Sequence, residues 1–392
     1  MPRAQVTDLL LLEDLLDPSE RATRDAFATF VDEEVLPGIG GWFREGHFPR
    51  HLIPALARLG IFGGNLQGHG CAGWNAVAYG LALQELERGD SGLRTFASVQ
   101  GSLVMYPIHT FGSDAQKARW LPELAAGRAI GCFGLTEASA GSNPGGMQTH
   151  ARRDGDGWVL EGAKAWITNG AIADLAVVWA KTDGGGPESV RGFLVDMASP
   201  GVRATEVEGK FSLRASTTAS LHFDGVRLGG DALLPGARGL KGPLACLNQA
   251  RAGIGFSVTG AAIACFESAR AYALERLQFD RPLAGYQLTQ AKLADMLQEI
   301  VKAQLLGLRV LRLKDQGRAT PDMVSLLKRN NVAAALEIAR VARGILGANG
   351  VSDAWPPIRH MLNLESVSTY EGTHEVHTLV LGKAITGLDA FR

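Results

Sequence analysis

The stretch that decides the fold is "GCFGLTEASAGSN", residues 131–143, where the texture of the sequence changes. Before it, segments such as "AVAYGLALQELERG" (76–89) carry apolar residues at helical spacing, broken by Gly and Pro. After it, short β-rich runs such as "GWVLEGAKAWITNG" (157–170) and "ASLHFDGVRL" (219–228) are separated by Gly, Asp and Asn. This change predicts that a small β-domain begins here.

Helical patterns return at about Gly239 and are long. Examples are "TQAKLADMLQEIVKAQLLGLRVLRLKD" (289–315) and "PDMVSLLKRNNVAAALEIARVARGIL" (321–346). The order is therefore α, then β, then α, which predicts an α+β protein. We expect an N-terminal α-helical domain over residues 1–130, a middle β-domain over 131–238 and a C-terminal α-helical domain over 239–392.

The composition is that of an ordinary globular protein with a large core, since 46% of its 392 residues are hydrophobic and 20% are charged. The net charge of −1 supplies no field that would draw the chain to nucleic acid or to an anionic membrane. The four cysteines are scattered without a CxxC pair, which favours reduced thiols in a cytosolic setting. The apolar run near the N-terminus is short and interrupted by acids, so it predicts neither a signal peptide nor a membrane span. We therefore expect a cytoplasmic protein.

Several common sites have no matching motif. No GxGxxG follows a strand, and there is no P-loop motif. The histidines of "HEVH" (374–377) are three apart, unlike those of HExxH, and Pro49 interrupts the helix that would align His47 with His51. We predict no metal site. Nearer the N-terminus, Asp17 predicts a helix start, with Pro18 at the first helical position.

A lone acid, Glu371, precedes the apolar run in "STYEGTHEVHTLVLGKAITG" (368–387). Thr373 is a plausible N-cap of the following helix, and Glu375 would lie in its first turn. Glu371 would then lie in the loop that enters the helix. It could project into a cleft, or it could be an ordinary solvated loop acid.

Three further segments allow both a functional and a structural interpretation. The loop of residues 132–143 can present N–H groups and hydroxyls to a polar ligand, or it can be a surface turn. Trp166 and Thr168 are two apart in a strand, which suits a planar heteroaromatic ligand or a core tryptophan. Arg276 and Phe279 are three apart at a predicted helix end, with Gln287 after the turn. This arginine could reach a phosphate or could satisfy the helix dipole.

Arg94 lies in "ELERGDSGLRTFASVQ" (85–100), where residues 89–92 break a helix. If Ser91 caps the next helix, Arg94 lies at about its third position. A cation there opposes the helix dipole by roughly 0.3–1 kcal/mol, and local rules tend to be broken at functional sites. We therefore expect an anion nearby. It could be internal, from Glu87 or Asp90, or it could be an external carboxylate.

Taken together and in this order, these motifs resemble the acyl-CoA dehydrogenase family of flavoenzymes, and within it the glutaryl-CoA dehydrogenases. The resemblance extends from the N-terminal helices to the last residues. The matching stretches are "LERGDSGLRTFASVQGSLVMYPI", "GCFGLTEASAGSN", "AWITNGAIADLAVVWAK", "GKFSLRAS", "QLTQAKLADM", "MVSLLKRNN", "LGANGVSD" and "YEGTHEVHTLVLGKAITG". It implies an N-terminal helical domain, a middle β-domain and a C-terminal domain like a four-helix bundle, usually assembled as a homotetramer.

The resemblance also implies FAD, bound non-covalently between the middle and C-terminal domains and reached by a neighbouring subunit. The matching cofactor positions are Phe133, Leu135, Thr136, Gly141, Ser142, Trp166, Ile167, Thr168, Arg276, Phe279, Gln287, Gly344, Leu346, Gly347, Ala348, Thr373 and Glu375.

For the substrate, the resemblance implies an acyl-CoA thioester, and Glu371 matches the base that takes its α-proton while the flavin N5 takes the β-hydride. The matching substrate positions are Glu87, Arg94, Thr95, Ser142, Leu244, Leu247, Asn248, Arg251, Tyr370 and Gly372. Arg94 would hold the γ-carboxylate of glutaryl-CoA, Glu87 would tune that hold, and Arg251 would orient Glu371. The implied reaction yields crotonyl-CoA and CO2, as in lysine and tryptophan degradation, with electron-transferring flavoprotein as acceptor.

Some positions depart from the family pattern. Thr95 stands where many relatives have Ser, Phe96 is bulkier than usual, and Asn143 replaces an Asp. A dehydrogenase of another acyl-CoA, or one that oxidises a dicarboxylic thioester without decarboxylation, therefore stays an alternative. A DNA-binding relative is a remote one, because it would need a basic stripe, whereas 39 Lys and Arg face 40 Asp and Glu in this chain.

Overall fold

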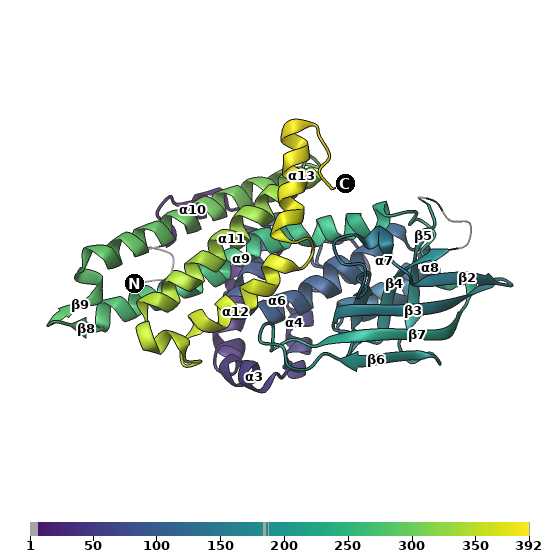
Figure 1. The fold of residues 1–392 in the computed structure, drawn as a ribbon, viewed down its shortest axis with the longest axis horizontal. Coiled ribbons are helices and arrows are strands. Elements are labelled where there is room, and N and C mark those ends of the chain that lie inside the picture. The colour runs from purple at the N-terminus through teal and green to yellow at the C-terminus, as the bar shows by residue number, and fades with distance from the viewer. Residues whose placement is uncertain (1–6, 183–185, 187, 392) are drawn as a thin grey trace.

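The computed structural model describes residues 7–182, 186 and 188–391. The molecule is elongated, with a β-sheet at one end and long helices at the other (Figure 1). The N-terminal helices lie between them and contact both parts. This order of helices, sheet and helices confirms the predicted α+β fold.

Helices of moderate length form the N-terminal part. They are α2 (Pro18–Phe30), α3 (Ile39–Glu45), α4 (Ile53–Arg58), α5 (Ala76–Gly89), α6 (Ser91–Ser98), α7 (Tyr106–Phe111) and α8 (Asp114–Ala125), with the 3-10 turns η1 (Leu12–Leu15) and η3 (Arg50–Leu52) and the π-helical turns η2 (Val31–Val35) and η4 (Val99–Met105). The predicted start of α2 is confirmed, because Asp17 and Glu20 form a capping box with Pro18 at the first position.

The middle part is a seven-stranded sheet in the order β1-β4-β2-β3-β7-β6, with β5 pairing to β4. Its strands are β1 (Gly131–Gly134), β2 (His150–Asp154), β3 (Gly157–Thr168), β4 (Leu175–Thr182), β5 (Val190–Asp196), β6 (Val202–Glu206) and β7 (Thr218–Leu228), and the short turns η5 (Pro144–Gly146) and η6 (Gly230–Ala232) flank them. The sequence did not reveal β2 and β6. Both have only five residues and are largely exposed, so they carry too little apolar pattern for a strand to be recognised.

The C-terminal part is built around α9 (Lys241–Glu275), which packs against α11, α10 and α5. The other elements are the hairpin β8 (Leu277–Gln278) and β9 (Arg281–Pro282), the helices α10 (Gln287–Asp315), α11 (Pro321–Ile345), α12 (Pro356–Thr369) and α13 (His374–Thr386), and the turns η7 (Leu283–Gly285) and η8 (Gly347–Val351). Within the described residues, α9 is the one helix with the length and hydropathy of a membrane span, and 78% of its apolar window is buried inside the protein. That burial is typical of the central helix of a bundle.

One expectation for this part is wrong. Arg276 and Phe279 do not lie together on a helix end, because α9 ends at Glu275 and Phe279 occupies the tip of the β8–β9 hairpin with φ of +53°. The hairpin projects at the end of the molecule far from the sheet (Figure 1).

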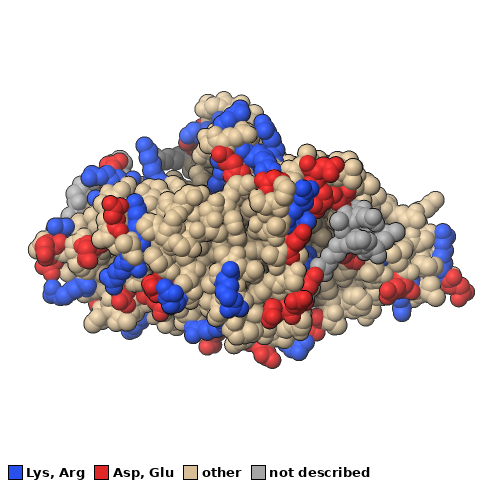
Figure 2. Space-filling view, turned by 180° about the vertical axis from the view of Figure 1, so that it is seen from behind, with Lys and Arg blue, Asp and Glu red and all other residues tan. Residues whose placement is uncertain are grey.

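Charges of both signs are interspersed over the face opposite that of Figure 1, around a broad area of uncharged side chains (Figure 2).

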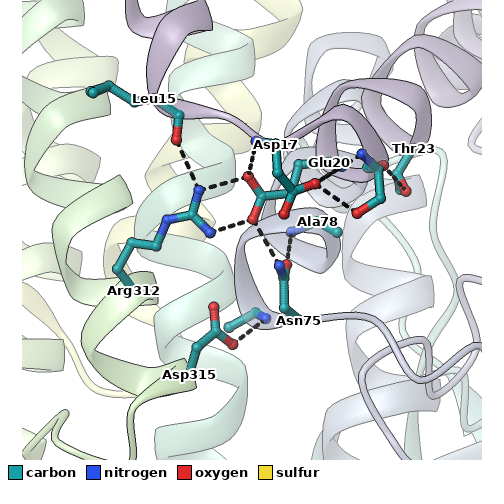
Figure 3. A network of polar contacts seen from close by, with 10 residues as sticks. Leu15, Asp17, Glu20, Thr23, Asn75, Ala78, Arg312 and Asp315 are labelled. Atoms are coloured by element: carbon teal, nitrogen blue, oxygen red, sulfur yellow. Dashed lines mark hydrogen bonds and ion pairs between the residues drawn. The ribbon is translucent and has the colours of Figure 1, made fainter.

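A polar network around the buried carboxylate of Glu20 joins the N-terminal helices to the bundle (Figure 3). Glu20 is fully buried, and its carboxylate accepts hydrogen bonds from Arg312 Nη2 at 2.6 Å, Asn75 Nδ2 at 2.7 Å and the Asp17 N–H at 2.9 Å. Asp315 accepts from the N–H of Ala76 at 2.6 Å. The start of α2 and the start of α5 are thus both tied to the end of α10.

We predict that Arg312→Met lowers the free energy of unfolding by about 2–4 kcal/mol, because it leaves a buried carboxylate without its cation. Urea unfolding of the FAD-loaded protein measures this. The matched control is Arg128→Met, since Arg128 also uses two nitrogens to hold one carboxylate, that of Glu123, at 2.7 Å, but on the surface. Its loss of stability should be much smaller, because water screens an exposed ion pair. Equal losses in the two variants would contradict a special role for the buried network.

Candidate active site

A cavity with a volume of about 1220 Å³ is lined by residues of all three parts. Ligand pockets usually span about 300–1,000 Å³, so this cavity has room for more than one small ligand. It brings together many of the positions predicted from the sequence: Thr95, Phe133, Leu135, Thr136, Gly141, Ser142, Trp166, Ile167, Thr168, Leu244, Leu247, Asn248, Arg251, Tyr370, Glu371, Gly372 and Thr373.

Glu371 lies on the cavity wall, in the loop between α12 and α13. Thr373 caps α13 by accepting a hydrogen bond from the Val376 N–H, as the sequence predicted. The carboxylate oxygen Oε2 of Glu371 is buried and has no hydrogen-bond partner among the described residues. Because Glu371 lines the cavity and its Oε2 has no hydrogen-bond donor among the described residues, this carboxylate is available to accept a proton from a ligand.

The backbone of this loop is held by two cations. Arg251 donates from Nε to the Glu371 carbonyl at 2.6 Å, so it contacts the main chain of Glu371. Lys328, which sequence reasoning missed, donates from Nζ to the carbonyls of Tyr370 and Gly372 at 2.7 Å each. Its signal was present, because Lys328 lies on the buried face of α11 among Val324, Leu327 and Asn331. A charge on an apolar helix face is a candidate functional group.

Burial raises the pKa of Glu371 to about 6, even though Arg251, Lys328 and Arg94 act in the opposite direction. Burial lowers the pKa of Lys328 to about 7, although Glu371 acts against this shift. A carboxylate with a pKa near 6 is suited to act as a general base close to neutral pH.

Arg94 and Glu87 are fully buried directly behind the cavity wall. Arg94 donates from Nε to Glu87 at 2.5 Å and from Nη2 to the hydroxyl of Tyr370, whereas its Nη1 has no partner among the described residues. The internal anion that the sequence left open is therefore Glu87. One guanidinium nitrogen is left over.

The expected cap of this helix is wrong in detail. Asp90, and not Ser91, caps α6 by accepting from the Gly92 N–H at 2.7 Å, which puts Arg94 at the fourth helical position. Ser91 instead donates its hydroxyl to Glu87 at 2.6 Å. Asp90 also accepts from Arg359 at 2.6 Å. This contact with α12, which no local pattern reveals, favours Asp90 as the cap.

The wall formed by the sheet carries hydroxyls and an indole ring. Trp166 is 65% exposed and has φ of +60°, where the register of β3 and β7 shifts between Lys164 and Ile167. The expected simple alternation of Trp166 and Thr168 on one strand face is therefore interrupted by an irregularity, yet both residues line the cavity. Open indole and hydroxyl groups on one wall suit a flat ligand with polar edges.

A buried ion pair fixes the loop above this wall. Lys164 donates to Glu137 at 2.8 Å and to the Leu135 carbonyl at 3.1 Å. Burial alone would raise the pKa of Glu137, but the N–H groups of Gln148 and Thr149, together with Lys164, hold it at about 2. This pair keeps residues 135 and 136 in place at the cavity edge.

The remaining predicted cofactor positions do not line the cavity of this chain, as far as the described residues show: Arg276, Phe279, Gln287, Gly344, Leu346, Gly347, Ala348 and Glu375. Arg276 and Phe279 belong to the β8–β9 region, Gln287 starts α10, and residues 344–348 are at the end of α11 and in η8. Phe279 is 93% exposed. Glu375 lies in the first turn of α13, as predicted.

Family models match nearly the whole chain. The acyl-CoA dehydrogenase N-terminal domain matches residues 17–128, the middle domain 132–226 and the C-terminal domain 237–386. The short-chain specific acyl-CoA dehydrogenase of Bos taurus mitochondria is 36% identical over 370 residues, which cover 93% of this chain and 90% of that protein. The chain belongs to the acyl-CoA dehydrogenase family.

Solved structures agree with this assignment. A glutaryl-CoA dehydrogenase of Mycobacterium smegmatis is 54% identical, with a TM-score of 0.96 and 99% of both chains covered. A structure of a glutaryl-CoA dehydrogenase of the same organism in complex with FADH2 is 53% identical, with a TM-score of 0.96 and 98% of both chains covered.

This acyl-CoA dehydrogenase is an FAD-dependent oxidoreductase. Its cavity fits the cofactor, since the exposed indole of Trp166 and the hydroxyl-bearing Thr136, Ser142 and Thr168 lie on one wall. These residues would hold the flavin against the sheet.

We predict that Trp166→Ala weakens FAD binding about 2- to 10-fold, the loss of roughly 0.5–1.5 kcal/mol of aromatic contact. Equilibrium dialysis of the apoprotein against FAD measures this. Trp120→Ala is the control, because Trp120 is a partly buried tryptophan of α8 outside the cavity. Unchanged affinity in Trp166→Ala, or equal weakening in both variants, would remove Trp166 from the flavin site.

Proposed function

We propose that this enzyme oxidises and decarboxylates glutaryl-CoA, giving crotonyl-CoA and CO2, with Glu371 as the base. The observation that carries the choice of substrate is the buried Nη1 of Arg94, a cationic donor without a partner among the described residues, next to the cavity-lining Thr95. The similarity to two glutaryl-CoA dehydrogenase structures at 54% and 53% identity supports it.

The first step is removal of the α-proton of the thioester. Such a proton is weakly acidic, so the base must be aimed at it and must be ionised at the working pH. Glu371 meets the second condition with its pKa of about 6, and its unpartnered Oε2 is free to receive the proton. Bound FAD supplies the acceptor for the hydride that leaves the β-carbon, so the substrate loses two hydrogens and becomes a glutaconyl thioester.

The distal carboxylate of the substrate would satisfy Arg94. A buried donor without a partner loses its hydration with no compensation, and an apolar acyl tail would leave it in that condition. A carboxylate at this position forms a charge-assisted hydrogen bond. Glu87, already bonded to Arg94 at 2.5 Å, competes for the same cation and limits how firmly the carboxylate is held.

Decarboxylation then needs no further oxidant. The bond between the γ-carbon and the carboxylate breaks, its electron pair enters the conjugated thioester, and CO2 leaves. The resulting dienolate takes a proton at the γ-carbon to give crotonyl-CoA. Glu371, which carries the proton removed in the first step, is the proposed donor.

We also propose that the enzyme is a homotetramer in which one copy reaches the FAD of another. The support is that Arg276, Phe279 and Gln287 match cofactor positions but lie outside the cavity of their own chain. An exposed hairpin with Phe279 at its tip is suited to contact a second copy. Electron-transferring flavoprotein is the proposed acceptor of the electrons, on the family resemblance.

We predict that Glu371→Gln keeps FAD and substrate binding but lowers kcat by at least 10²–10⁴-fold, the usual contribution of a general base. Anaerobic stopped-flow reduction of the flavin by glutaryl-CoA measures the chemical step, and the flavin absorbance of the purified variant controls for folding. Near-normal flavin reduction would assign the base to another residue.

We further predict that Arg94→Gln lowers kcat/KM for glutaryl-CoA by a factor that corresponds to about 1.5–3 kcal/mol, the value of a hydrogen bond to a charged group. Butyryl-CoA has no distal carboxylate and serves as the internal control, so its kcat/KM should change far less. An equal loss for both substrates would mean that the arginine is structural.

Mass spectrometry of the products separates the two kinds of dicarboxylic thioester oxidation. Crotonyl-CoA with one equivalent of CO2 supports the proposal, and glutaconyl-CoA as the end product would identify an enzyme that does not decarboxylate.

A further inference from the structure

Lys328 lies on α11 and is only 2% exposed, in the row of residues that α11 buries. Its ammonium group donates to the carbonyl oxygens of Tyr370 and Gly372, at 2.7 Å in each case. These are the two residues that flank Glu371. A buried lysine that contacts both neighbours of one acid, with no carboxylate within ion-pair distance among the described side chains, is unusual.

Lys328 and Arg251 together donate hydrogen bonds to three successive backbone carbonyls, those of residues 370–372. Arg251 donates to the middle one, that of Glu371, at 2.6 Å. The chain can present its carbonyls in this way because Glu371 and Gly372 have φ of +51° and +91°. Left-handed backbone is unfavourable for a residue with a side chain, so the surrounding contacts must hold it there.

Gly372 shows how closely the loop is packed. A Cβ at this position would be 2.9 Å from His377 Nε2 and 3.2 Å from Arg251 Nη2. A side chain at position 372 would therefore crowd His377 of α13 and Arg251 of α9, and Lys328 of α11 contacts the loop from a third helix. The orientation of the Glu371 carboxylate is set by this three-sided arrangement.

We propose that Lys328 is a positioning residue for Glu371, whose hydrogen bonds fix the loop and whose positive charge keeps the carboxyl group ionised near neutral pH. The proposal rests on the proposed function, because it takes Glu371 to be the base.

The charge of Lys328 acts in a defined direction. An opposite charge within about 4–6 Å lowers the pKa of a carboxyl group by about 1–3 units. Burial raises the pKa of Glu371, and the neighbouring cations bring it back towards its ordinary value. Replacing Lys328 by a neutral side chain should therefore raise the pKa of Glu371. The other charged or titratable groups that act on Glu371 or Lys328 are Arg251 from α9, Arg94 from α6, Tyr79 from α5 and His377 from α13.

Lys328 also lies close to Tyr370, the residue whose hydroxyl contacts Arg94. Its ammonium lies 5.9 Å from the centre of the Tyr370 ring, and the Arg94 guanidinium lies 5.8 Å from the same centre. The Tyr370 hydroxyl accepts from Arg94 while its carbonyl accepts from Lys328. Tyr370, the residue before the proposed base, is thus held by Lys328 at its backbone and by Arg94 at its hydroxyl. Arg94 is also the residue proposed to bind the substrate carboxylate.

The test is the pH dependence of kcat/KM for glutaryl-CoA in the FAD-loaded Lys328→Met enzyme. The wild type should lose activity on the acid side around pH 6. In Lys328→Met this acid limb should move up by about one pH unit. At pH 6.5 such a shift lowers the ionised fraction of Glu371 about 3-fold, so kcat should fall by about that factor or more, with a smaller change in KM. A residue that served only to stabilise the fold would not move the limb.

Lys314→Met is the matched control. Lys314 is a lysine of α10 whose pKa burial lowers to about 8, and it donates a long hydrogen bond of 3.4 Å to the carbonyl of Gln249, away from the Glu371 loop. Its replacement should leave the acid limb where it is in the wild type. A shift of the same size in both variants would overturn the proposal, because the effect would then not depend on contact with the Glu371 loop.

Lys328→Gln separates the charge from the hydrogen bonds, and it gives the result if Lys328→Met does not accumulate as a flavoprotein. The glutamine amide can still donate to a carbonyl, so kcat should recover in part, whereas the acid limb should stay shifted as in Lys328→Met. An unmoved acid limb in Lys328→Gln would overturn the proposed role of the charge. Glu371→Gln distinguishes failure of the proposed base from failure of the proposed role of Lys328. If it still reduces flavin, the base assignment fails. If it does not, and the Lys328 variants keep the wild-type limb, only the role of Lys328 fails.

Discussion

The contacts of two buried cations with three successive carbonyl oxygens hold the loop on which the active site depends. Lys328 and Arg251 come from α11 and α9, the helices that pack most closely in the bundle, and the loop itself joins α12 to α13. A buried ammonium or guanidinium group must find acceptors, and backbone carbonyls turned inward by a left-handed conformation supply them. The same contacts therefore satisfy the cations and offset the strain of the loop.

A second polar junction sets the position of Arg94. Asp90 caps α6 and also accepts from Arg359 at 2.6 Å and from Asn363 at 2.9 Å, both on α12. α12 ends next to the loop of Glu371. Arg94, which would bind the substrate carboxylate, and Glu371, the proposed base, are therefore positioned by opposite ends of α12. Tyr370 connects them, because it precedes Glu371 and contacts Arg94 directly. Because each member of such a buried network leaves a costly unpaired group when it is removed, the two groups are expected to keep a fixed separation.

The cofactor side of the cavity is built from different elements than the side that carries Glu371. Its wall is a sheet, and an irregularity in β3 turns Trp166 outward instead of into the core. The ion pair of Lys164 and Glu137 supports the neighbouring loop, with backbone N–H groups completing the coordination of the carboxylate. Rigid backbone with few charges towards the cavity suits the binding of a large planar group, whereas the concentration of charge around Glu371 and Arg94 suits proton transfer and carboxylate recognition.

The sequence by itself determined the features that local physics controls. The order of helices, sheet and helices follows from hydrophobic periodicity, and the starts of α2 and α13 follow from Asp17 and Thr373, whose side chains satisfy N–H groups within three residues. The acid in the loop before α13 and the arginine in the first turns of α6 stood out because each departs from a local rule. The resemblance to a family of flavoenzymes then connected them.

Only the tertiary structure decided what depends on partners distant in the chain. Asp90 replaces Ser91 as the cap because Arg359 and Asn363 approach it, and Lys328 becomes part of the site because α11 packs beside a loop more than 40 positions later. β2 and β6 form although they are short and largely exposed. In each case the deciding energy comes from hydrogen bonds and packing between segments, which no local pattern of residues encodes.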